Sequence, residues 1–352
     1  MTHFPSSFSA SDSIHSVFAR IQPSLDLIEG AMREQLTSGS ELVVAMGEHV
    51  ISSGGKRMRP ALLLLSAELC GYTGPRRVQI AAAIELLHTA TLMHDDVVDL
   101  ADLRRGRPSA NAIWGNRRAV LAGDFFYARA SSMVVEDGDI EILGVFANTI
   151  RLMAEGELLQ LQHSFDSTIT EAQHHAVIER KSATLLSAAC EAGAILAGVT
   201  RGERRSVAQF GHQLGLAFQL RDDALDYESS EAELGKLPLT DIREGKVTLP
   251  LLLTLKRCTN GEREQVASVL KSAARRAELT EQPVPGESSE AEIDAELAPV
   301  VEFVERYRGV ADTVRRAEQH VAAACASIAA FADGTAKRSL TAAASFAVAR
   351  DR

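Results

Sequence analysis

Apolar residues recur every three or four positions along most of the 352-residue chain, which places them on one face of an α-helix. Runs of alternating apolar and polar residues, which indicate half-buried strands, are few. Glycine and proline fall mostly between the periodic segments. The pattern predicts helices over residues 13–38, 40–53, 60–70, 75–101, 115–135, 139–163, 171–198, 203–227, 247–257, 262–276, 294–329 and 336–350.

These helices predict an all-α protein, a single large helical bundle around a central cavity. The polar segment 279–292 is the clearest break in the pattern. We interpret it as a surface connection, because no complete core follows it. One domain is therefore predicted over residues 13–352, after a flexible tail at residues 1–12.

Composition narrows the class of protein. The net charge of −10 argues against nucleic acid or an anionic membrane as the main partner, although local cations can still bind small anions. Four cysteines far apart in sequence, with no CxxC pair, indicate reduced thiols in a cytoplasmic protein. The N-terminus has no signal-peptide pattern and no run approaches eighteen apolar residues, so any membrane contact is expected to be peripheral.

Two acidic segments share the pattern D-D-x-x-D, namely "HDDVVDL" at residues 94–100 and "RDDALDY" at residues 221–227. Each follows apolar residues near the end of a predicted helix and precedes a basic segment. The first and last aspartates of each copy are one turn apart, so they share a face and repel each other unless a cation lies between them. Magnesium is typically held by one or two carboxylates, waters and phosphate oxygens. Two facing copies therefore predict a magnesium and polyphosphate site.

Other metal sites fit less well. Neither copy has the twelve-residue loop of an EF-hand, with its glycine and terminal glutamate. A zinc site is disfavoured because His94 has no partner at ligand spacing.

The segment "SSGGKRMRP", residues 52–60, combines a glycine pair, three cations and the start of a predicted helix. Exposed amides, a helix N-terminus and cations together favour anion binding. It is not a Walker A loop, since GxxxxGK[ST] is absent. Of its cations, Arg57 is the one most expected to face solvent, while Lys56 and Arg59 are expected to bind the anion.

Further residues near the motifs are candidates for the same site, although each has a simpler explanation. Arg104, Arg105, Lys181, Lys236 and Lys246 are either phosphate ligands or ordinary surface cations. His88 lies two turns before the first motif on the same helical face, and it either points at the cavity or is a core histidine. Gln219 could donate to a phosphate.

These motifs resemble the trans-type isoprenyl diphosphate synthases, the polyprenyl synthetase family, from about residue 20 to the end. Within the family the resemblance is nearest to the long-chain bacterial members, similar to octaprenyl diphosphate synthase. The blocks that carry it are "GGKRMRP", "IELLHTATLMHDDVVDLADLRRGRPSAN", "GDFFYARA", "AEGELLQL", "KSATLL", "GLAFQLRDDALDY" and "DIREGKVTLPLLL".

The resemblance implies a prenyltransferase of isoprenoid biosynthesis, with the fold of the isoprenoid synthases. Such an enzyme uses magnesium, three ions per active site with substrate bound, to condense isopentenyl diphosphate with an allylic diphosphate such as farnesyl or geranylgeranyl diphosphate. The product would be a medium- or long-chain all-trans polyprenyl diphosphate, made by head-to-tail (1'-4) condensation. The resemblance also implies a homodimer, and peripheral membrane contact when product is released.

Residue roles follow from the same resemblance. The implied metal-binding residues are Asp95, Asp99, Asp222 and Asp226, supported by Asp96 and Asp223. The implied allylic diphosphate site consists of Arg104, Lys181, Ser182, Gln219 and Lys236. The implied isopentenyl diphosphate site consists of Lys56, Arg59, His88 and Arg105, and Lys246 is a further substrate-binding candidate. The implied catalytic set is Asp95, Asp96, Asp99, Arg104, Lys181, Asp222, Asp223 and Lys236.

The sequence specifies the chain length of the product less well. Short-chain family members place bulky aromatics one turn before the first motif, where this chain has Ala90 and Thr91, so a longer product is expected. The growing product is expected to occupy a tunnel between helices. Four larger side chains could close that tunnel further down, or could simply pack in the core: Phe125, Phe126, Met133 and Phe146.

Two departures from the family pattern lie near the second motif. Leu239 stands where the family usually has glycine, which puts the loop around Lys236 and Asp241 in doubt, whereas Ser182 in place of threonine keeps the hydroxyl. The main alternative is a shorter-chain farnesyl or geranylgeranyl diphosphate synthase. A terpene cyclase is disfavoured because the isopentenyl diphosphate motif looks intact, and a regulatory subunit of a heteromeric synthase is disfavoured because both aspartate motifs are complete.

Overall fold

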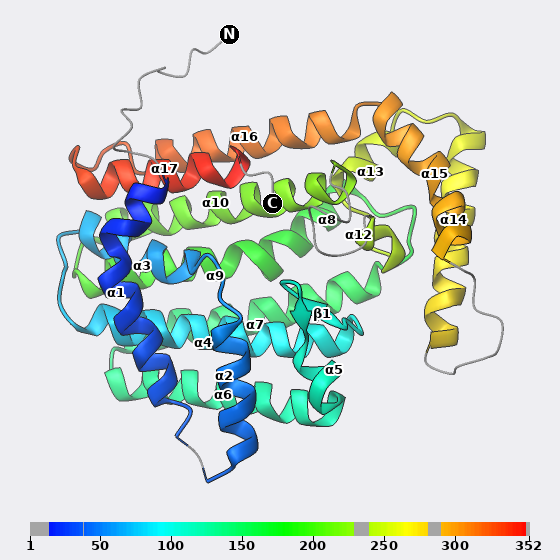
Figure 1. The fold of residues 1–352 in the computed structure, drawn as a ribbon. Coiled ribbons are helices and arrows are strands. Elements are labelled where there is room, and N and C mark those ends of the chain that lie inside the picture. Colours follow the sequence, from blue (N-terminus) through cyan, green and yellow to red (C-terminus); the bar gives the residue numbers. More distant parts are fainter. Residues whose placement is uncertain (1–13, 38, 229–238, 281–289, 350–352) are drawn as a thin grey trace. The chain divides into compact units, whose positions relative to one another are not determined.

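The structure is a computed structural model that describes residues 14–37, 39–228, 239–280 and 290–349 (Figure 1). The predicted tail at residues 1–12, Lys236 and most of the segment 279–292 lie outside the described residues. Across the described ranges, no helix has the length and apolar character needed to cross a membrane.

The described chain is helical apart from one short hairpin, which confirms the all-α prediction. In chain order the elements are α1 (Ile14–Glu34), α2 (Glu41–Ser52), α3 (Met58–Leu69), α4 (Arg76–Val98), β1 (Leu103–Arg104), β2 (Arg107–Pro108), α5 (Ala110–Trp114), α6 (Asn116–Asp137), α7 (Ile140–Gln162), α8 (Glu171–Ile178), the π-helix η2 (Glu179–Ala183), α9 (Thr184–Leu196), α10 (Arg201–Glu228), α12 (Thr240–Arg243), α13 (Leu249–Leu255), α14 (Asn260–Thr280), α15 (Glu290–Arg306), α16 (Gly309–Ser327) and α17 (Thr335–Ala349).

Two of the predicted helices are interrupted. The segment 171–198 contains the π-helical turn η2 between α8 and α9. The prediction of one helix over 294–329 is wrong, because the backbone breaks at Arg308, whose φ is 60°. The next residue, Gly309, packs against α13 so closely that a Cβ there would lie 2.3 Å from the carbonyl oxygen of Pro250. Apolar periodicity continues through this break and therefore does not indicate it.

The hairpin is the main element that helical periodicity misses. Its strands pair antiparallel, with Leu103 opposite Pro108 and Arg104 opposite Arg107. The two loop residues, Arg105 and Gly106, have φ values of 55° and 72°. Positive φ at both positions is the geometry of a type I′ turn, whose twist matches that of the flanking strands. The hairpin therefore holds the basic segment after the first aspartate motif in a defined conformation.

The chain forms two compact units, each built from several segments. The first unit comprises Met1–Arg151, Thr184–Leu214 and Ala322–Phe346, and the second comprises Leu152–Ala183, Gly215–Val321 and Ala347–Arg352. Neither unit is a continuous stretch of chain. The single domain expected over residues 13–352 stays a prediction.

In the first unit, α4 is the central helix and packs along α6, while α3 packs along α9. Helices α4 and α6 run antiparallel, since Arg76 at the start of α4 pairs with Asp137 at the end of α6. At the other end, His94 of α4 contacts Gly123, where a Cβ would lie 2.4 Å from the imidazole. This packing fixes the C-terminal end of α4, which carries the first aspartate motif.

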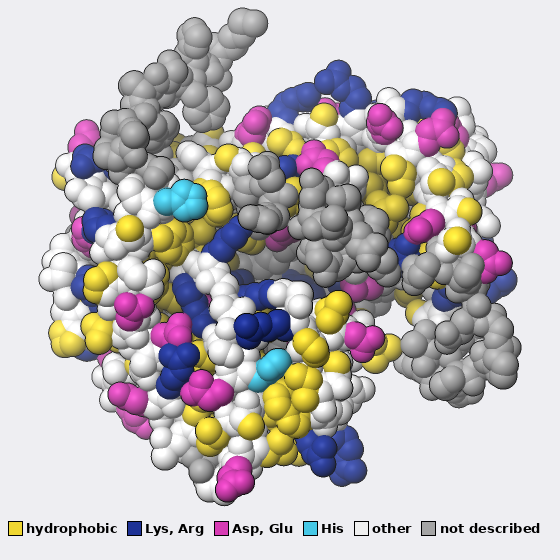
Figure 2. Space-filling model, viewed as in Figure 1, with side chains coloured by type: hydrophobic (Ala, Val, Ile, Leu, Met, Phe, Trp, Pro, Cys, Tyr) yellow, Lys and Arg dark blue, Asp and Glu magenta, His cyan; other side chains and the backbone are white. Residues whose placement is uncertain are grey.

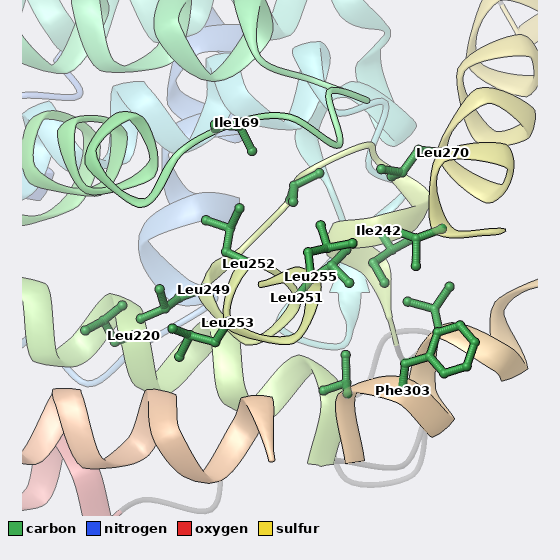
Figure 3. Close-up of a cluster of buried hydrophobic side chains, with 14 of the residues drawn as sticks. Ile169, Leu220, Ile242, Leu249, Leu251, Leu252, Leu253, Leu255, Leu270 and Phe303 are labelled. Carbon is green, nitrogen blue, oxygen red and sulfur yellow. The ribbon is translucent and has the colours of Figure 1, made fainter. Parts of the chain in front are cut away.

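In the second unit, the core surrounds the short helix α13 (Figure 3). Every residue of α13 is buried, so the helix has no solvent-facing side. Its leucines meet apolar side chains from the surrounding elements: Ile169, Leu220, Ile242, Leu270 and Phe303. Burying a leucine contributes about 1.5–3 kcal/mol. This core supports α10, which carries the second aspartate motif.

Candidate active site

The first aspartate motif occupies the C-terminal end of α4, and its three carboxylates differ in exposure. Asp95 and Asp99 are partly exposed, whereas Asp96 is 4% exposed. Asp99 ends the helix, and its backbone N–H donates to the carbonyl oxygen of Asp95 at 2.7 Å. Because these two residues are one turn apart, they lie on the same side of the helix. They are the pair that the sequence predicts as metal ligands.

Asp96 instead holds an arginine of the hairpin. The Nε and Nη2 atoms of Arg104 lie 2.6 and 2.5 Å from Oδ1 of Asp96. Burial raises the pKa of the Asp96 carboxyl, and the Arg104 guanidinium opposes that shift. The Asn111 side chain also donates to the carbonyl oxygens of Asp96 and Ala101, both at 3.1 Å. The supporting role predicted for Asp96 therefore takes a specific form, the orientation of Arg104.

His88 lies on α4 among the cations of the predicted isopentenyl diphosphate site. Desolvation lowers the pKa of His88 well below 6.5, and nearby arginines lower it further: Arg59, Arg105, Arg104 and Arg57. A neutral imidazole can donate one hydrogen bond without adding to the positive charge. The structure thus gathers four of the predicted substrate-binding residues, His88, Arg59, Arg104 and Arg105, in one part of the first unit.

The glycine pair of the predicted cradle makes room for the hairpin tip. A Cβ on Gly55 would lie 2.5 Å from Nη1 of Arg105, so only glycine allows the guanidinium to lie against the backbone there. Next to it, Nζ of Lys56 lies 4.9 Å from the centroid of the Phe346 ring on α17. Figure 2 shows a group of Lys and Arg side chains near the centre of the face drawn, despite the acidic net charge.

The expectation that Arg57 faces solvent is wrong. Arg57 caps the N-terminus of α3 with a φ of 44°, and its side chain is mostly buried. Its Nη1 donates to Oε1 of Glu85 at 2.9 Å, and its Nη2 donates to the carbonyl oxygen of Ile51 at 2.9 Å. Glu85 is a buried carboxylate of α4. Its negative charge offsets part of the positive charge that the surrounding arginines create.

The second aspartate motif lies near the C-terminal end of α10 and shows a related division. Asp222 is partly exposed, whereas Asp223 and Asp226 are 1% and 2% exposed. The two oxygens of the Asp226 carboxylate accept from the backbone N–H groups of Thr240 and Asp241, at 3.2 and 3.0 Å. Asp226 thus anchors the start of α12. A metal-binding role for Asp226 stays a prediction.

Leu239, which stands where the family usually has glycine, takes the conformation that glycine favours. Its φ is 58° and its ψ is 31°, in the left-handed region. Its backbone N–H donates to the carbonyl oxygen of Asp226 at 3.2 Å. The turn therefore forms without glycine, at a cost in backbone strain.

Asp223 belongs to a network of four polar side chains within the second unit. Gln219 donates from Nε2 to Oδ1 of Asp223 at 3.0 Å, and Nε2 of His174 lies 3.1 Å from Oδ2. Ser182 donates its hydroxyl to Oε1 of Gln219 at 2.6 Å. Two of the residues predicted to hold the allylic diphosphate, Ser182 and Gln219, are therefore in direct contact.

The π-helix η2 positions Lys181 and Ser182. Isolated π-helical turns within α-helices occur frequently at functional sites. Gly156 of α7 lies so near this turn that a Cβ would be 2.7 Å from the backbone nitrogen of Lys181. Nζ of Lys181 pairs with Glu157 at 2.5 Å.

Lys246, the remaining described cation of the predicted site, pairs with Glu244 at 2.5 Å. Three acidic or imidazole side chains around the site were not predicted from the sequence: Glu157, which pairs with Lys181, His174, which contacts Asp223, and Glu85, which pairs with Arg57. Glu85 lies in the block that begins "IELLH" and Glu157 lies in "AEGELLQL", so these two could have been found from the sequence, whereas His174 lies outside every block.

The donor set fits magnesium. Asp95, Asp99 and Asp222 offer partly exposed carboxylate oxygens, the ligands of a hard cation. Within the described ranges, no three His, Cys, Asp or Glu side chains converge on one point. Magnesium needs no such cage, because waters and substrate phosphates complete its octahedral shell.

Comparison with known proteins identifies the family. The model of the family described as "Polyprenyl synthetase" matches residues 40–284. The chain belongs to the polyprenyl synthetase family. It is 38% identical over 325 residues to an octaprenyl diphosphate synthase of Escherichia coli (strain K12), covering 92% of this chain and 95% of that protein. It is 42% identical over 258 residues to an all-trans-nonaprenyl-diphosphate synthase (geranyl-diphosphate specific) of Rhodobacter capsulatus, covering 73% and 79% of the two chains.

Solved structures agree with this polyprenyl synthetase assignment and with the isoprenoid synthase fold. A polyprenyl synthase from Caulobacter crescentus CB15, complexed with calcium and isoprenyl diphosphate, superposes with a TM-score of 0.88 at 35% identity. The match covers 98% of this chain and 100% of that one. A decaprenyl diphosphate synthase from Rhodobacter capsulatus superposes with a TM-score of 0.86 at 32% identity. The match covers 96% of this chain and 99% of that one.

Proposed function

We propose that this member of the polyprenyl synthetase family is a long-chain polyprenyl diphosphate synthase. It extends an allylic diphosphate, such as farnesyl or geranylgeranyl diphosphate, with isopentenyl diphosphate in the trans configuration. The observation that carries the proposal is the exposure pattern of the two motifs. Asp95, Asp99 and Asp222 are partly exposed, while the other three aspartates of the motifs are buried and hold side chains or backbone amides.

The reaction breaks the carbon–oxygen bond of the allylic diphosphate and forms a carbon–carbon bond to isopentenyl diphosphate. Magnesium, held by Asp95, Asp99 and Asp222, would stabilise the charge of the departing diphosphate as a Lewis acid. The proposal includes three magnesium ions per active site when substrate is bound. Arg104 and Lys181, each fixed by a carboxylate, would bind the same diphosphate through charge-assisted hydrogen bonds.

Isopentenyl diphosphate is assigned to the cluster of Lys56, Arg59, His88 and Arg105. The lowered pKa of His88 makes it a neutral hydrogen-bond donor within a cationic cluster. After the new bond forms, the proton lost from the isopentenyl unit goes to the released diphosphate. Apolar helix faces around the reacting carbons exclude water, which would otherwise quench the allylic cation.

The long product is proposed from residues along α4 within the first unit. Thr91 lies one turn before Asp95 and Ala90 lies beside it, and both side chains are small, so no bulky aromatic blocks this part of the helix. A small pocket with almost entirely apolar walls lies against the earlier part of α4, between α7 and α9, and Phe146 lines it with Ile80 and Ile84. Of the four predicted floor residues, Phe146 is therefore the one we assign to the end of the tunnel. The other three candidates, Phe125, Phe126 and Met133, do not line this pocket.

Two further properties belong to the proposal. The chain is expected to act as a homodimer in the cytoplasm, with membrane contact limited to product release. Support for the dimer comes from an exposed apolar stripe on α6, which includes Leu121 and Val135. These residues are fourteen positions apart, nearly four helical turns, and so share one face.

A direct assay tests the proposal. Purified protein with magnesium, farnesyl diphosphate and labelled isopentenyl diphosphate should yield an extractable labelled product, whose length mass spectrometry measures. Asp95→Ala and Asp222→Ala should each abolish turnover, while Asp102→Asn, an exposed aspartate of the same stretch, should keep it. A cyclic hydrocarbon formed from farnesyl diphosphate alone would indicate a cyclase, and a protein active only with a second polypeptide would indicate a subunit.

A further inference from the structure

His174 is a buried polar side chain that the proposed reaction does not use. It lies on α8, whose first turn is closed by a reciprocal capping box between Thr170 and Gln173. Glu171 holds the same helix to Lys256 and Arg316, each at 2.6 Å. His174 is therefore carried on a short, well-anchored helix, and its side chain is 6% exposed.

We propose that His174 is a positioning residue that fixes the polar network of the second aspartate motif, an inference that rests on the proposed function. Its Nε2 lies 3.1 Å from Oδ2 of Asp223. An ionised carboxylate only accepts hydrogen bonds, so Nε2 carries the proton and donates. The other oxygen, Oδ1, accepts from Gln219. The Asp223 carboxylate is thus held at both oxygens.

This arrangement fixes the amide orientation of Gln219. Its Nε2 must face the Asp223 carboxylate, and its Oε1 must face the hydroxyl of Ser182, which donates to it at 2.6 Å. The second N–H of the amide then remains to bind a phosphate oxygen. Without the donor on His174, the Asp223 carboxylate can rotate, and the orientation of Gln219 is no longer defined.

The consequence differs for the two substrates. The network consists of His174, Asp223, Gln219 and Ser182, and all four residues belong to the second unit. Asp223 also adjoins Asp222, the proposed metal ligand. The residues proposed to bind isopentenyl diphosphate belong to the first unit. Loss of the His174 donor should therefore weaken the binding of magnesium and of the allylic diphosphate, and leave the binding of isopentenyl diphosphate unchanged. Removing a side chain that orients a metal site through its neighbours typically lowers metal affinity or activity roughly 10–100-fold.

Three variants test this inference. His174→Leu removes the donor, whereas His174→Gln keeps an N–H near the position of Nε2. His175→Leu is the matched control, because His175 lies on the same helix but is exposed. His174→Leu should raise the KM for farnesyl diphosphate roughly tenfold or more, with the KM for isopentenyl diphosphate unchanged. His174→Gln should recover most of the loss, and His175→Leu should behave as the wild type.

A binding measurement separates this inference from the proposed function. Calorimetric titration with magnesium and inorganic diphosphate should show weaker binding to His174→Leu, whether or not the protein turns over. If His174→Leu does not fold, His174→Asn takes its place, since its shorter side chain cannot reach Asp223. Equal affinity in the donor-deficient variant and the wild type would overturn the inference. So would an equal rise in both KM values, or a failure of His174→Gln to recover binding.

Discussion

At the scale of single residues, each buried aspartate of the two motifs has partners that offset its desolvation. A buried carboxylate is costly unless charged or N–H donors surround it. Asp96 has the Arg104 guanidinium, Asp223 has His174 and Gln219, and Asp226 has two backbone amides. The partners come from different elements, so they are not apparent from the D-D-x-x-D pattern. The pattern alone indicates six carboxylates and does not say which face solvent.

Leu239 provides a stability prediction. Left-handed backbone costs a residue with a Cβ about 1–2 kcal/mol, and Leu239 has a φ of 58°. Its side chain also packs against the core of the second unit, so Leu239→Gly alone would mix two effects. Both Leu239→Gly and Leu239→Ala lose the leucine side chain and its packing, so the difference in stability between them reports mainly the backbone strain.

The glycine variant should be more stable than the alanine variant by about 1 kcal/mol, the reverse of the order expected in extended or helical backbone. Denaturant unfolding of both variants measures the difference. An alanine variant as stable as the glycine variant would contradict the strained turn.

His88 provides a pH prediction. Its pKa is lowered well below 6.5 in the folded protein, so the unfolded chain binds the proton more readily. Stability contributed by the neutral imidazole is complete above the unfolded pKa and is lost as the pH falls below it, by up to about 1.4 kcal/mol per pH unit. Unfolding of the substrate-free wild type and of His88→Gln should therefore diverge below pH 6.5.

In this comparison the wild type loses stability faster than His88→Gln as the pH falls from 7 to 5.5. Parallel stability curves for the two proteins over that range would mean that His88 titrates normally.

At the scale of elements, the long helices follow from the sequence, whereas the elements that shape the site do not. Helices such as α4 and α7 repeat apolar residues over six turns, so their pattern is unambiguous. The hairpin has two residues per strand, and η2 is a single turn. Such short elements are set by positive φ at Arg105 and Gly106 and by contact with Gly55 and Gly156, which depend on segments far apart in the chain.

The two glycines of the cradle provide an element-scale prediction. Both Gly54 and Gly55 have positive φ, so alanine strains the backbone at either site. Only at Gly55 would the new Cβ displace the Arg105 guanidinium, since Gly54 has no neighbour within 4 Å. A charge-assisted hydrogen bond is worth about 1.5–3 kcal/mol. Gly55→Ala should therefore raise the KM for isopentenyl diphosphate at least roughly tenfold relative to Gly54→Ala.

Steady-state kinetics with isopentenyl diphosphate as the varied substrate measure this difference. Similar KM values in the two variants would show that Arg105 does not need this contact in order to bind substrate.

At the scale of the whole molecule, the exposed stripe on α6 bears on assembly. Leu121 and Val135 on α6 are 68% and 61% exposed, and Ile140 at the start of α7 is 76% exposed. Exposed apolar side chains along one helix face commonly mark an interface between proteins. The wild type should therefore have twice the 37.9 kDa mass of one chain.

Leu121→Glu should shift the protein toward the monomer, because a carboxylate would be buried without a partner at the interface. Leu27→Glu, on a similarly exposed leucine of α1, should leave the dimer intact. Light scattering after size exclusion measures the mass. A dimer that persists in Leu121→Glu, or a wild-type monomer, would exclude α6 as the interface.

The mostly buried pair of Arg57 and Glu85 constrains how this protein can diverge. Removing one partner of a buried ion pair costs about 3–5 kcal/mol, whereas replacing both by apolar residues is often neutral. A variant in which only one of the two residues has been replaced therefore has low stability, so neither residue can readily change alone. Among descendants of this protein, the residues at positions 57 and 85 should therefore be substituted together. A lineage that keeps glutamate at one and lacks a cation at the other would need compensation from a nearby arginine.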